Sequence, residues 1–581
     1  MFRLLKKYLK PYTSKIMLVM FLVVMQVVCE ISLPTIMASV VDIGLANGDT
    51  PYILKRGGLM LFLAACQTGA MLGIGFVSSR VSAYLGKNLR GDIFRKAQLF
   101  SLDELNEIGV SSMIVRNTND VTMLQNLTVI TMRMVLVAPA MCIGSLIVTF
   151  SINARLASVI LLSVPFLILL FTCIIRSSTK LFGKLQKKID GINNLLREHL
   201  SGARVIRAFV NQKTEQKRFE DANASLCRIA TKVMRITSSM MPGLMMTVNL
   251  TIVAVCWFGA VQIEAGTMQV GQLMSFVQYV THILMSLAML SILMVILPRA
   301  NVSAKRINAV LDLKPRITDP QNPCVPDEKQ SCGTVEFRNV TFCYPGSDVP
   351  VLSDISFIAD SGKTTAFVGS TGCGKTTLLR LVLRFYDVTS GTVFFDGQDV
   401  RNYAMDELRS RTAYVPQRSV LFSGTISDNL RVGNEDASDE ELENALKTAQ
   451  AWDFVREKEY GMSEPVSQGG KNVSGGQKQR LSIARAIVRD CEVYLFDDSF
   501  SALDYATDAK LRQALERNEK TKEKTRLVVA QRISTVMNAD KIIVLEKGRI
   551  AGQGTHRELL ETCPVYREIA SSQLSEEELA L

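Results

Sequence analysis

The stretch Gly369-Ser-Thr-Gly-Cys-Gly-Lys375-Thr376-Thr377 decides the fold of the second half of the chain. It matches the P-loop pattern, in which glycines let successive backbone N–H groups turn towards phosphate oxygens at the start of a helix. The strand-like run TTAFVG leads into it and the helix-like run TTLLRLVLRFY follows, as the pattern requires. We therefore expect Lys375 to contact the terminal phosphates of a nucleotide and Thr376 to ligate Mg²⁺. The residues expected to hold the nucleotide are Gly369, Ser370, Thr371, Gly372, Cys373, Gly374, Lys375, Thr376 and Thr377.

A second element of such a site is an apolar strand that ends in Asp, and Glu492-Val-Tyr-Leu-Phe-Asp497 supplies it. We expect Asp497 to orient Mg²⁺ or its waters. A strand-end Asp is common in α/β proteins, so its weight comes from standing beside a P-loop. From Thr334 onward, β-branched runs alternate with helical patterns, which predicts an α/β domain over residues 334–581. Asp396-Gly397 predicts a hairpin turn within it.

The part of the chain before about residue 300 is far more apolar than the part after it, and 581 residues are too many for one core. Several nearly uncharged stretches are long enough to cross a hydrocarbon core of about 30 Å. They run from Ile16 to Val41, Gly57 to Ser79, Met134 to Ala154, Leu156 to Ile175, Ile236 to Ile263 and Ala265 to Pro298. The sequence therefore predicts a multidomain membrane protein with a six-helix, all-α transmembrane domain over residues 1–299. A polar linker over 300–333 then leads to the α/β P-loop domain.

Basic residues lie mostly between these stretches, so membrane topology explains the formal charge of +11 better than nucleic-acid binding does. The segments after the second and fourth stretches are long, basic and free of proline. This distribution predicts that both segments, both termini and the P-loop domain are cytoplasmic. Each long segment is expected to extend about 40 Å beyond the bilayer as helices. Their turns, near Asp103 to Gly109 and His199 to Val205, would then meet a cytoplasmic domain.

A few residues in the apolar half are candidates for contact with a transported compound. Gln26 and Glu30 lie one helical turn apart, and an ionisable residue at membrane depth is a functional candidate, although a structural helix contact stays open. Asp42, at the outer end of the first stretch, is either a gate residue or a helix cap. Methionines in the last two stretches suit varied apolar ligands, but ordinary packing is the simpler explanation for any one of them. They are Met240, Met241, Met245, Met246, Met285, Met289 and Met294.

The run Val473-Ser474-Gly475-Gly476-Gln477 resembles the signature motif of ABC ATPases. Tyr344 in FCYPG resembles the aromatic residue that stacks on adenine in that family, Gln417 in YVPQ the Q-loop glutamine, and Ser501-Ala-Leu-Asp504 the D-loop. The resemblance covers the chain end to end and implies one half of a type IV ABC exporter. In that family two nucleotide-binding domains sandwich two ATP molecules, each between the P-loop of one domain and the signature of the other. It implies that Ser474, Gly475, Gly476 and Gln477 bind ATP held by a partner, and that Gln417 serves the metal and the attacking water.

Two positions depart from the family pattern. Asp498 stands where the family has the Glu that activates water, and its carboxylate is one methylene shorter. A misplacement of about 1 Å can cost roughly a hundredfold in rate. Gln531 in LVVAQR stands where the family has the switch histidine, and glutamine cannot become a cation at neutral pH. A weaker departure is Gln468, where the element before the signature often has Glu.

This combination resembles the degenerate subunit of bacterial heterodimeric multidrug exporters of the cell membrane. The resemblance implies ATP and Mg²⁺, a partner half-transporter that keeps the Glu and the His, a small amphipathic cargo, a lipid bilayer and no nucleic acid. Neutral drift within a working enzyme is the other interpretation of the two departures. Alternative functions are a homodimeric exporter with slow turnover and a transporter of lipid, peptide, haem or siderophore. A membrane-bound ATP sensor that moves nothing is less favoured.

Overall fold

The computed structural model of the chain describes residues 1–324 and 332–574, apart from the side chains of residues 175 and 291–295. The linker residues 325–331 and the side chain of Met294 therefore fall outside it. Contacts divide the chain into two compact units. The first comprises Met1–Gln98 and Val110–Leu313, and the second comprises Leu99–Gly109 and Lys314–Leu581.

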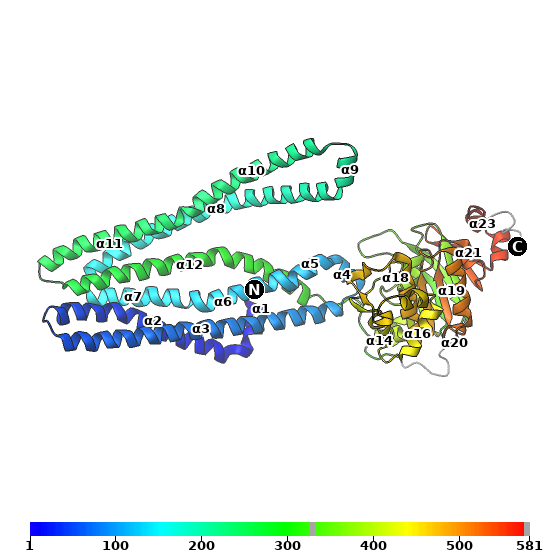
Figure 1. Ribbon diagram of the computed structural model, residues 1–581, viewed down its shortest axis with the longest axis horizontal. Coiled ribbons are helices and arrows are strands. Elements are labelled where there is room, and N and C mark those ends of the chain that lie inside the picture. The colour runs from blue at the N-terminus through cyan, green and yellow to red at the C-terminus, as the bar shows by residue number, and fades with distance from the viewer. Residues whose placement is uncertain (325–331, 575–581) are drawn as a thin grey trace. The chain divides into compact units, whose positions relative to one another are not determined.

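The described residues of the first unit form helices joined by short turns (Figure 1). Its helices are α1 (Phe2–Leu9), α2 (Thr13–Ser39), α3 (Thr50–Gln98), α5 (Val110–Val115), α6 (Val121–Ile130), α7 (Val137–Ile152), α8 (Ala154–Ser201), α9 (Ala203–Ala208), α10 (Gln212–Ser238), α11 (Met240–Glu264) and α12 (Val270–Leu311). Short 3₁₀ or π turns follow some of them, at Lys10–Tyr12, Val40–Leu45, Arg116–Asp120 and Thr131–Val135. Among the described residues, six helical runs are long and apolar enough to cross a bilayer, which confirms the predicted number of spans.

The helices pack through apolar rows that repeat about once per turn. On α2 such a row is Val19, Val23, Val27 and Ile31, and these side chains meet Ile74 and others in one buried cluster. Side-chain packing holds helices together in lipid, because lipid tails are themselves apolar. The same contacts fix which polar residues of α2 are left on its other faces.

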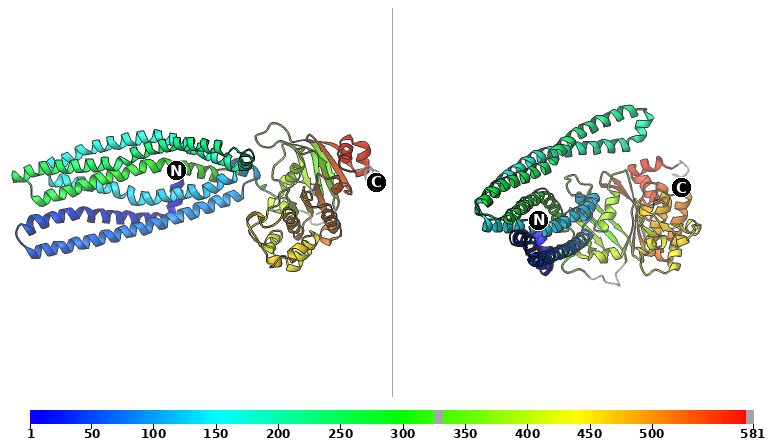
Figure 2. Two further views of the ribbon diagram at one scale, coloured as in Figure 1. Left: turned by 45° about the horizontal axis from the view of Figure 1, so that its top comes forward. Right: turned by 60° about the vertical axis from the view of Figure 1, so that its left-hand side comes forward.

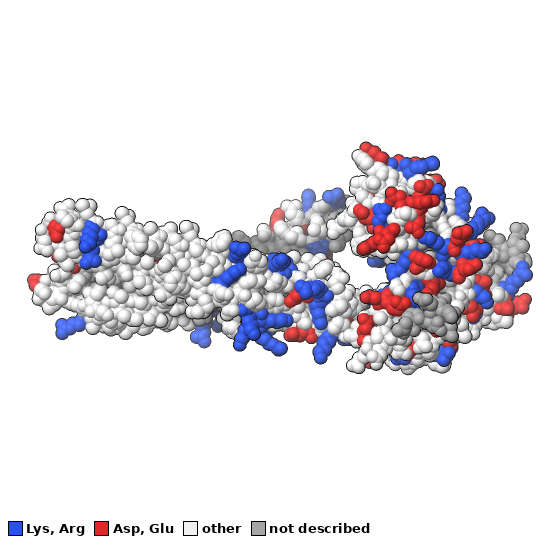
Figure 3. All heavy atoms as spheres, turned by 90° about the horizontal axis from the view of Figure 1, so that it is seen from below, with Lys and Arg blue, Asp and Glu red and all other residues white. Residues whose placement is uncertain are grey.

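Two helices continue far past their apolar stretches. α3 has 49 residues and α8 has 48, so at 1.5 Å per residue each is about 70 Å long, more than twice the hydrocarbon core. Figure 2 shows α8 and α10 running side by side to the short helix α9 at their tip. On the face in Figure 3, a broad band of the first unit is almost free of charged residues and is bordered on one side by a cluster of Lys and Arg. This pattern suits a membrane band with a basic edge.

Asp42 has a structural partner. Its carboxylate accepts hydrogen bonds from the backbone N–H groups of Gly271, at 2.6 Å, and of Gln272, at 3.1 Å. Both groups belong to the first turn of α12, where backbone N–H groups lack helical partners. Of the two roles considered for Asp42, the structure shows the helix cap.

The second unit is an α/β fold with two main sheets. The larger has the strand order β12-β11-β3-β10-β9-β6, in which all neighbours are parallel except the pair β11 and β12. Its strands are β3 (Thr364–Gly369), β6 (Thr412–Val415), β9 (Val493–Asp497), β10 (Thr525–Val529), β11 (Lys541–Glu546) and β12 (Arg549–Gly554). The other is antiparallel, in the order β2-β1-β4-β5, with β1 (Val335–Phe342), β2 (Leu352–Ala359), β4 (Ser390–Phe395) and β5 (Gln398–Asp399). A small pair joins β7 (Gly424–Thr425) to β8 (Pro465–Val466).

The predicted hairpin turn at Asp396-Gly397 is confirmed, because β4 and β5 pair antiparallel on either side of it. Both turn residues have positive φ, 47° and 74°, as a two-residue hairpin of this type requires. The helices of the unit are α4 (Leu102–Ile108), α13 (Lys375–Val382), α14 (Met405–Ser410), α15 (Ile426–Arg431), α16 (Asp439–Thr448), α17 (Trp452–Arg456), α18 (Gly475–Val488), α19 (Tyr505–Arg517), α20 (Glu519–Lys522), α21 (Ile533–Val536), α22 (His556–Thr562) and α23 (Pro564–Ser571).

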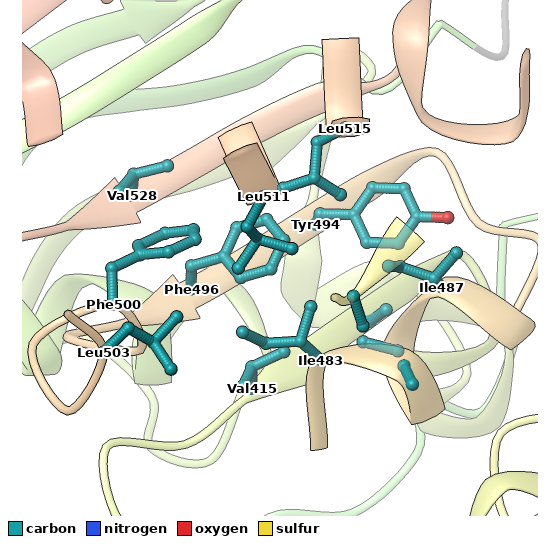
Figure 4. Close-up of a cluster of buried hydrophobic side chains, with 14 of the residues drawn as sticks. Val415, Ile483, Ile487, Tyr494, Phe496, Phe500, Leu503, Leu511, Leu515 and Val528 are labelled. Atoms are coloured by element: carbon teal, nitrogen blue, oxygen red, sulfur yellow. The ribbon is translucent and has the colours of Figure 1, made fainter. Parts of the chain in front are cut away.

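One hydrophobic core sets the position of strand β9. Figure 4 shows Tyr494 and Phe496 on this strand among side chains of α18 and α19, including Ile483 and Leu511. Every residue of β9 is buried, as expected for a strand covered on both faces. Its carboxyl end, at Asp497, is therefore held rigidly next to the ends of β10 and β6.

Helix α4 lies in the first long segment of the sequence but belongs to the second unit. Its Glu104 is fully buried, accepts a hydrogen bond from the backbone N–H of Arg316 at 2.9 Å and closes a capping box with Ser101. The Arg316 guanidinium pairs with Asp103 and lies 3.6 Å from Glu107. The first predicted cytoplasmic turn thus packs with the nucleotide fold of this same chain.

Candidate nucleotide site

The candidate site lies where three neighbouring parallel strands end. The P-loop follows β3, Asp497 and Asp498 stand at the end of β9, and Gln531 comes shortly after β10. Because β10 lies between β3 and β9, these loops meet at one edge of the sheet, where ligands of open α/β sheets bind. An open pocket at this edge brings together most residues that the sequence predicted for the nucleotide. It is lined by Tyr344, Val351, Thr371, Gly372, Gly374, Lys375, Thr376, Thr377, Gln417, Asp498, Val529 and Gln531.

The backbone of the P-loop needs glycine at two places. Gly369 has φ 151°, and a Cβ there would lie 2.2 Å from the carbonyl oxygen of Leu545. Gly374 has φ 103° and directly precedes helix α13, so its own N–H and those after it face the pocket. A Cβ on Gly374 would lie 2.6 Å from Leu352. The close approach of the loop to the neighbouring strands therefore depends on both glycines.

Lys375 is held over the loop and is only 8% exposed. Its ammonium donates to the carbonyl oxygens of Gly369, at 2.7 Å, and Ser370, at 2.9 Å, and lies 3.6 Å from the Cys373 sulfur. These bonds keep a buried cation satisfied, and phosphate oxygens can replace them. Lys375 is therefore placed to bind a terminal phosphate.

The expected metal side is built from oxygen atoms. The Thr376 hydroxyl donates to one carboxylate oxygen of Asp497 at 2.7 Å, and the Tyr414 hydroxyl donates to the other at 3.0 Å. A hydroxyl beside a carboxylate suits Mg²⁺, which prefers oxygen ligands and takes the rest of its shell from phosphates and water. The residues present therefore fit the ion. The sequence analysis missed Tyr414, although it stands three residues before Gln417 in the same strand-to-loop segment. Burial and the charge of Asp497 raise the pKa of this tyrosine.

The three residues expected to be catalytic, Asp498, Gln417 and Gln531, are joined by hydrogen bonds to Asp498. One of its carboxylate oxygens accepts from the side-chain amides of Gln417, at 3.2 Å, and Gln531, at 2.8 Å. The other oxygen is buried and has no hydrogen-bond partner among the described residues. Burial raises the pKa of the Asp498 carboxyl, and the charge of Asp497 adds to this shift. Two neutral amides therefore hold the shorter carboxylate, with one acceptor oxygen free.

Tyr344 lies at the rim of the pocket. Its hydroxyl shares a hydrogen bond with Thr377 of the P-loop helix at 2.9 Å and accepts one from Arg380 at 3.3 Å. Its ring packs edge to face against Phe342 and Tyr386, with centroids 4.9 and 5.2 Å away. These contacts fix the plane of the ring, as a stacking platform for a base requires.

A residue near the C-terminus holds the loop that carries Gln531. The Gln573 amide donates to the backbone oxygen of Gln531, at 3.0 Å, and accepts from the N–H of Ile533, at 2.8 Å. The guanidinium of Arg532 donates to the backbone oxygens of Leu503 and Ser501. No signal in the sequence pointed to Gln573, because its partners are backbone groups about forty residues away.

The signature residues lie elsewhere in the unit. Ser474 caps α18: its hydroxyl accepts from the N–H of Gln477 at 3.3 Å, and the Gln477 side chain accepts from the N–H of Ser474 at 3.1 Å. Ser474 and Gly475 are exposed, while Gly476 and Gln477 are half-buried. None of them is among the described residues that line the P-loop pocket. Gln26 and Glu30, the candidates for the substrate path, are half-buried on α2 in the first unit.

Two protein-family descriptions match this chain. Residues 16–287 match the ABC transporter transmembrane region, and residues 352–501 match the ABC transporter domain. The two matches fall in the helical part and in the P-loop part of the chain, in the predicted order.

Curated relatives match along most of the chain. An uncharacterised ABC transporter ATP-binding protein of Mycobacterium tuberculosis is 42% identical over 573 residues, 98% of both chains. A probable multidrug resistance ABC transporter of Bacillus subtilis is 32% identical over 88% of this chain and 75% of its own length. A fatty acid ABC transporter of Mycobacterium tuberculosis is 32% identical over 83% and 75%.

A solved structure shares the fold. The structure of a bacterial Atm1-family ABC exporter with ATP bound matches 97% of this chain and 99% of its own with a TM-score of 0.80, at 24% identity. The order of six apolar helical runs followed by the nucleotide fold is therefore confirmed.

Proposed function

This chain belongs to the ABC transporter family, and from that premise we propose that it is one subunit of a heterodimeric exporter of amphipathic or lipophilic compounds. It is a multi-pass membrane protein with an ATP-binding domain of the exporter type. The observation that carries the proposal is the contrast between an intact P-loop and signature and the Asp498–Gln531–Gln417 cluster. In this proposal the chain binds ATP in a degenerate site and lends its signature to the active site of its partner.

ATP binding is assigned to the pocket residues as follows. Tyr344 stacks on the base, the N–H groups of Gly369 to Thr377 surround the phosphates, and Lys375 exchanges its two carbonyl partners for phosphate oxygens. Thr376, Asp497 and Gln417 hold the metal side. Mg²⁺, when bound, neutralises the charge of the phosphate oxygens.

Slow hydrolysis at this chain's own site follows from the contacts of Asp498. Two amides occupy one of its carboxylate oxygens, and its side chain, one methylene shorter, holds the remaining oxygen further back than a Glu would. Gln531 can donate to a phosphate oxygen but carries no positive charge. The site is thus suited to holding ATP rather than to rapid turnover.

The signature is suited to a nucleotide that comes from outside the chain. The Ser474 hydroxyl and the exposed N–H groups at the start of α18 form the positive end of a helix of 14 residues. In the proposal they complete the site built on the partner's P-loop, Glu and His. A separate observation favours a second subunit: apolar side chains are exposed at the tip of the second long segment, with Val205 60% and Phe209 79% exposed.

The topology that we propose places both termini and the nucleotide-binding domain on the cytoplasmic side of a bacterial cell membrane. It rests on the basic segments that border the apolar band. The proposed domains are residues 1–299, a linker over 300–333 and residues 334–581. Nothing in this arrangement calls for nucleic acid.

Several alternative functions each have an observation in their favour. Lipid or fatty acid transport is favoured by the names of some relatives, and a homodimer by the presence of every ATP-binding motif in one chain. Peptide, haem or siderophore transport would use the same architecture. An ATP sensor that moves nothing is favoured only by the weak catalytic site.

The test is steady-state ATPase activity of this chain alone and after co-expression with a neighbouring half-transporter. Activity that requires the partner, and that is lost on changing the partner's Glu but not Asp498, supports the proposal. A stable homodimer with robust activity of its own would contradict it.

A further inference from the structure

The apolar stretches predicted to span the membrane hold only two residues of the kinds Asp, Glu, His, Lys and Arg. These are Glu30 and His282, on the first and the last of the spanning helices. The fold places both residues near one packed contact between these two helices, α2 and α12. Ionisable side chains at membrane depth are costly unless they face the protein interior or a water-filled cavity. Because these two residues lie on neighbouring helices, we asked what they could bind together.

A buried contact between α2 and α12 fixes this meeting. The hydroxyl of Tyr279, which is fully buried, donates to the backbone oxygen of Ile31 at 2.7 Å and shares a hydrogen bond with Thr35 at 2.6 Å. Glu30 directly precedes Ile31 on α2, and His282 stands one turn after Tyr279 on α12, with their rings in edge contact. The tyrosine thus brings the turn of α2 that carries Glu30 next to the turn of α12 that carries His282.

The two side chains offer hydrogen-bond acceptors at the Glu30 carboxylate and at the unprotonated ring nitrogen of His282. The Nδ1 atom of His282 is buried and has no hydrogen-bond partner among the described residues. Both side chains are half-buried, and so is Gln26, one turn before Glu30. A carboxylate accepts hydrogen bonds only, and a neutral imidazole accepts one at its unprotonated nitrogen. The six apolar stretches themselves contain no Lys or Arg.

We propose that Glu30 and His282 together recognise a protonated amine on the exported compound, so that the cargo is a cationic amphiphile. This inference rests on the proposed export function. An ammonium group donates to the Glu30 carboxylate and to Nδ1 of His282, and Met285, half-buried one turn further along α12, offers apolar surface to the tail. A carboxylate or phosphate head group would instead meet the like charge of Glu30 in a medium of low dielectric constant. The site therefore disfavours anionic lipids and fatty acids.

The test uses amphiphiles that differ only in their head group. We would attach the same dansyl-labelled alkyl chain to a primary ammonium, a hydroxyl or a carboxylate. Binding to the full chain with its partner in lipid nanodiscs, and ATP-dependent uptake into inverted vesicles, would both be measured. The ammonium compound is expected to bind at least tenfold more tightly than the hydroxyl compound, and the carboxylate compound most weakly. Equal binding of the three compounds, or preference for the carboxylate, would overturn the inference.

Variants test the two residues separately from the fold. Glu30→Gln is expected to remove the preference for the ammonium over the hydroxyl compound, and Glu30→Asp to restore part of it. His282→Leu is expected to weaken ammonium binding several-fold while leaving hydroxyl binding unchanged. Glu264→Gln is the matched control, because Glu264 is exposed at the end of α11. A Glu30→Gln protein that keeps the full preference would show that the pair is a structural contact.

Failure of the export proposal is distinguishable from failure of this inference. Binding needs no turnover, so the head-group preference is measured even if no compound is transported. ATP hydrolysis without movement of any of the three compounds, together with a clear ammonium preference in binding, would count against export and leave the site standing. ATP-driven movement with no head-group preference would sink the site and leave export standing.

Discussion

The P-loop side and the signature side of the nucleotide fold differ in how far this chain completes them. On the P-loop side, Lys375, Asp497 and Asp498 are all buried and hydrogen-bonded to groups of the same chain. On the signature side, Ser474 and Gly475 are exposed, and Ser474 exchanges hydrogen bonds with Gln477 in the first turn of its own helix. A buried side is preorganised for a ligand before binding, whereas an exposed helix start needs the ligand to be presented to it. This difference is what the proposal of two separate nucleotides, one on each side, would require.

The largest effect is expected from the signature side. Ser474→Ala removes a hydroxyl donor to phosphate and should lower the ATPase rate of the assembled transporter about a hundredfold, since loss of one preorganised donor costs about 10²–10³ in rate. Nucleotide binding to this chain's own P-loop should be unchanged. The measurement is steady-state phosphate release from the co-purified pair, with binding of a fluorescent ATP analogue measured in parallel.

Ser438→Ala is the matched control for this change. Ser438 caps α16 with the same capping-box geometry, its hydroxyl accepting from the N–H of Glu441 at 3.3 Å, and it is also exposed. Both variants should lose about 1 kcal/mol of stability from the missing cap. Only Ser474→Ala should lose activity. Equal loss of activity in the two variants would mean that the capping of a helix, and not contact with a nucleotide, is what matters at Ser474.

A smaller effect is expected from the P-loop side. Lys375→Ala should weaken ATP binding to this chain about 10- to 100-fold, because hydrogen bonds to charged groups contribute about 1.5–3 kcal/mol. The ATPase rate of the pair should fall less than in Ser474→Ala, since the proposed active site uses the partner's P-loop. Lys363→Ala, at an exposed lysine just before β3, is the control. If Lys375→Ala stops turnover as completely as Ser474→Ala, the two sides contribute to one and the same rapid step.

The sequence predicted most residues of the P-loop side and of the signature side, because the motifs that contain them are short and local. The P-loop, the strand that ends in Asp497 and the position of Gln531 each follow from a short run beside a strand or helix, and the helical spans follow from hydropathy. Local patterns could not show what Asp498 contacts. Gln417 and Gln531 reach it only because β6, β9 and β10 are neighbours in the sheet.

Contacts between distant parts of the chain account for what was missed. Glu104 is buried against Arg316, more than two hundred residues later, and no periodic pattern links the two. Gln573 and His282 likewise gain their significance from partners on other elements. Asp42 was left open between a gate and a cap, because the residues that it caps lie at the far end of the transmembrane half.

A still smaller effect is expected when the catalytic position itself is changed. Asp498→Asn should leave the ATPase rate of the pair within about threefold of the wild type, since the nearby amides already limit what this carboxylate can do. The same change at the partner's Glu should lower the rate by more than a hundredfold. The two variants would be compared in a single-turnover assay of the co-purified pair. A fall of tenfold or more in Asp498→Asn would show that this chain hydrolyses ATP at its own site.

The smallest expected effect is a pH dependence of stability. It tests whether Asp498, on the P-loop side, is as buried as the structure shows. The folded protein raises the pKa of Asp498 above its ordinary value, mainly because burial disfavours the charged form. The folded state therefore binds this proton more tightly than the unfolded state does. Its contribution to stability is fully present below the ordinary pKa of about 4 and is lost as the pH rises through the raised folded value. Nucleotide-free thermal unfolding should be followed from pH 3.5 to 8. The melting temperature of the wild type should fall over this window, relative to that of Asp498→Asn, and then level off.

Asp504→Asn is the comparison of opposite sign, because hydrogen bonds from Thr507 lower the pKa of the exposed Asp504. The melting temperature of the wild type, relative to that of Asp504→Asn, should therefore rise with pH. A difference between wild type and Asp498→Asn that does not change with pH would mean that Asp498 titrates as a solvated carboxylate. The contrast between a buried P-loop side and an exposed signature side would then lose its electrostatic basis.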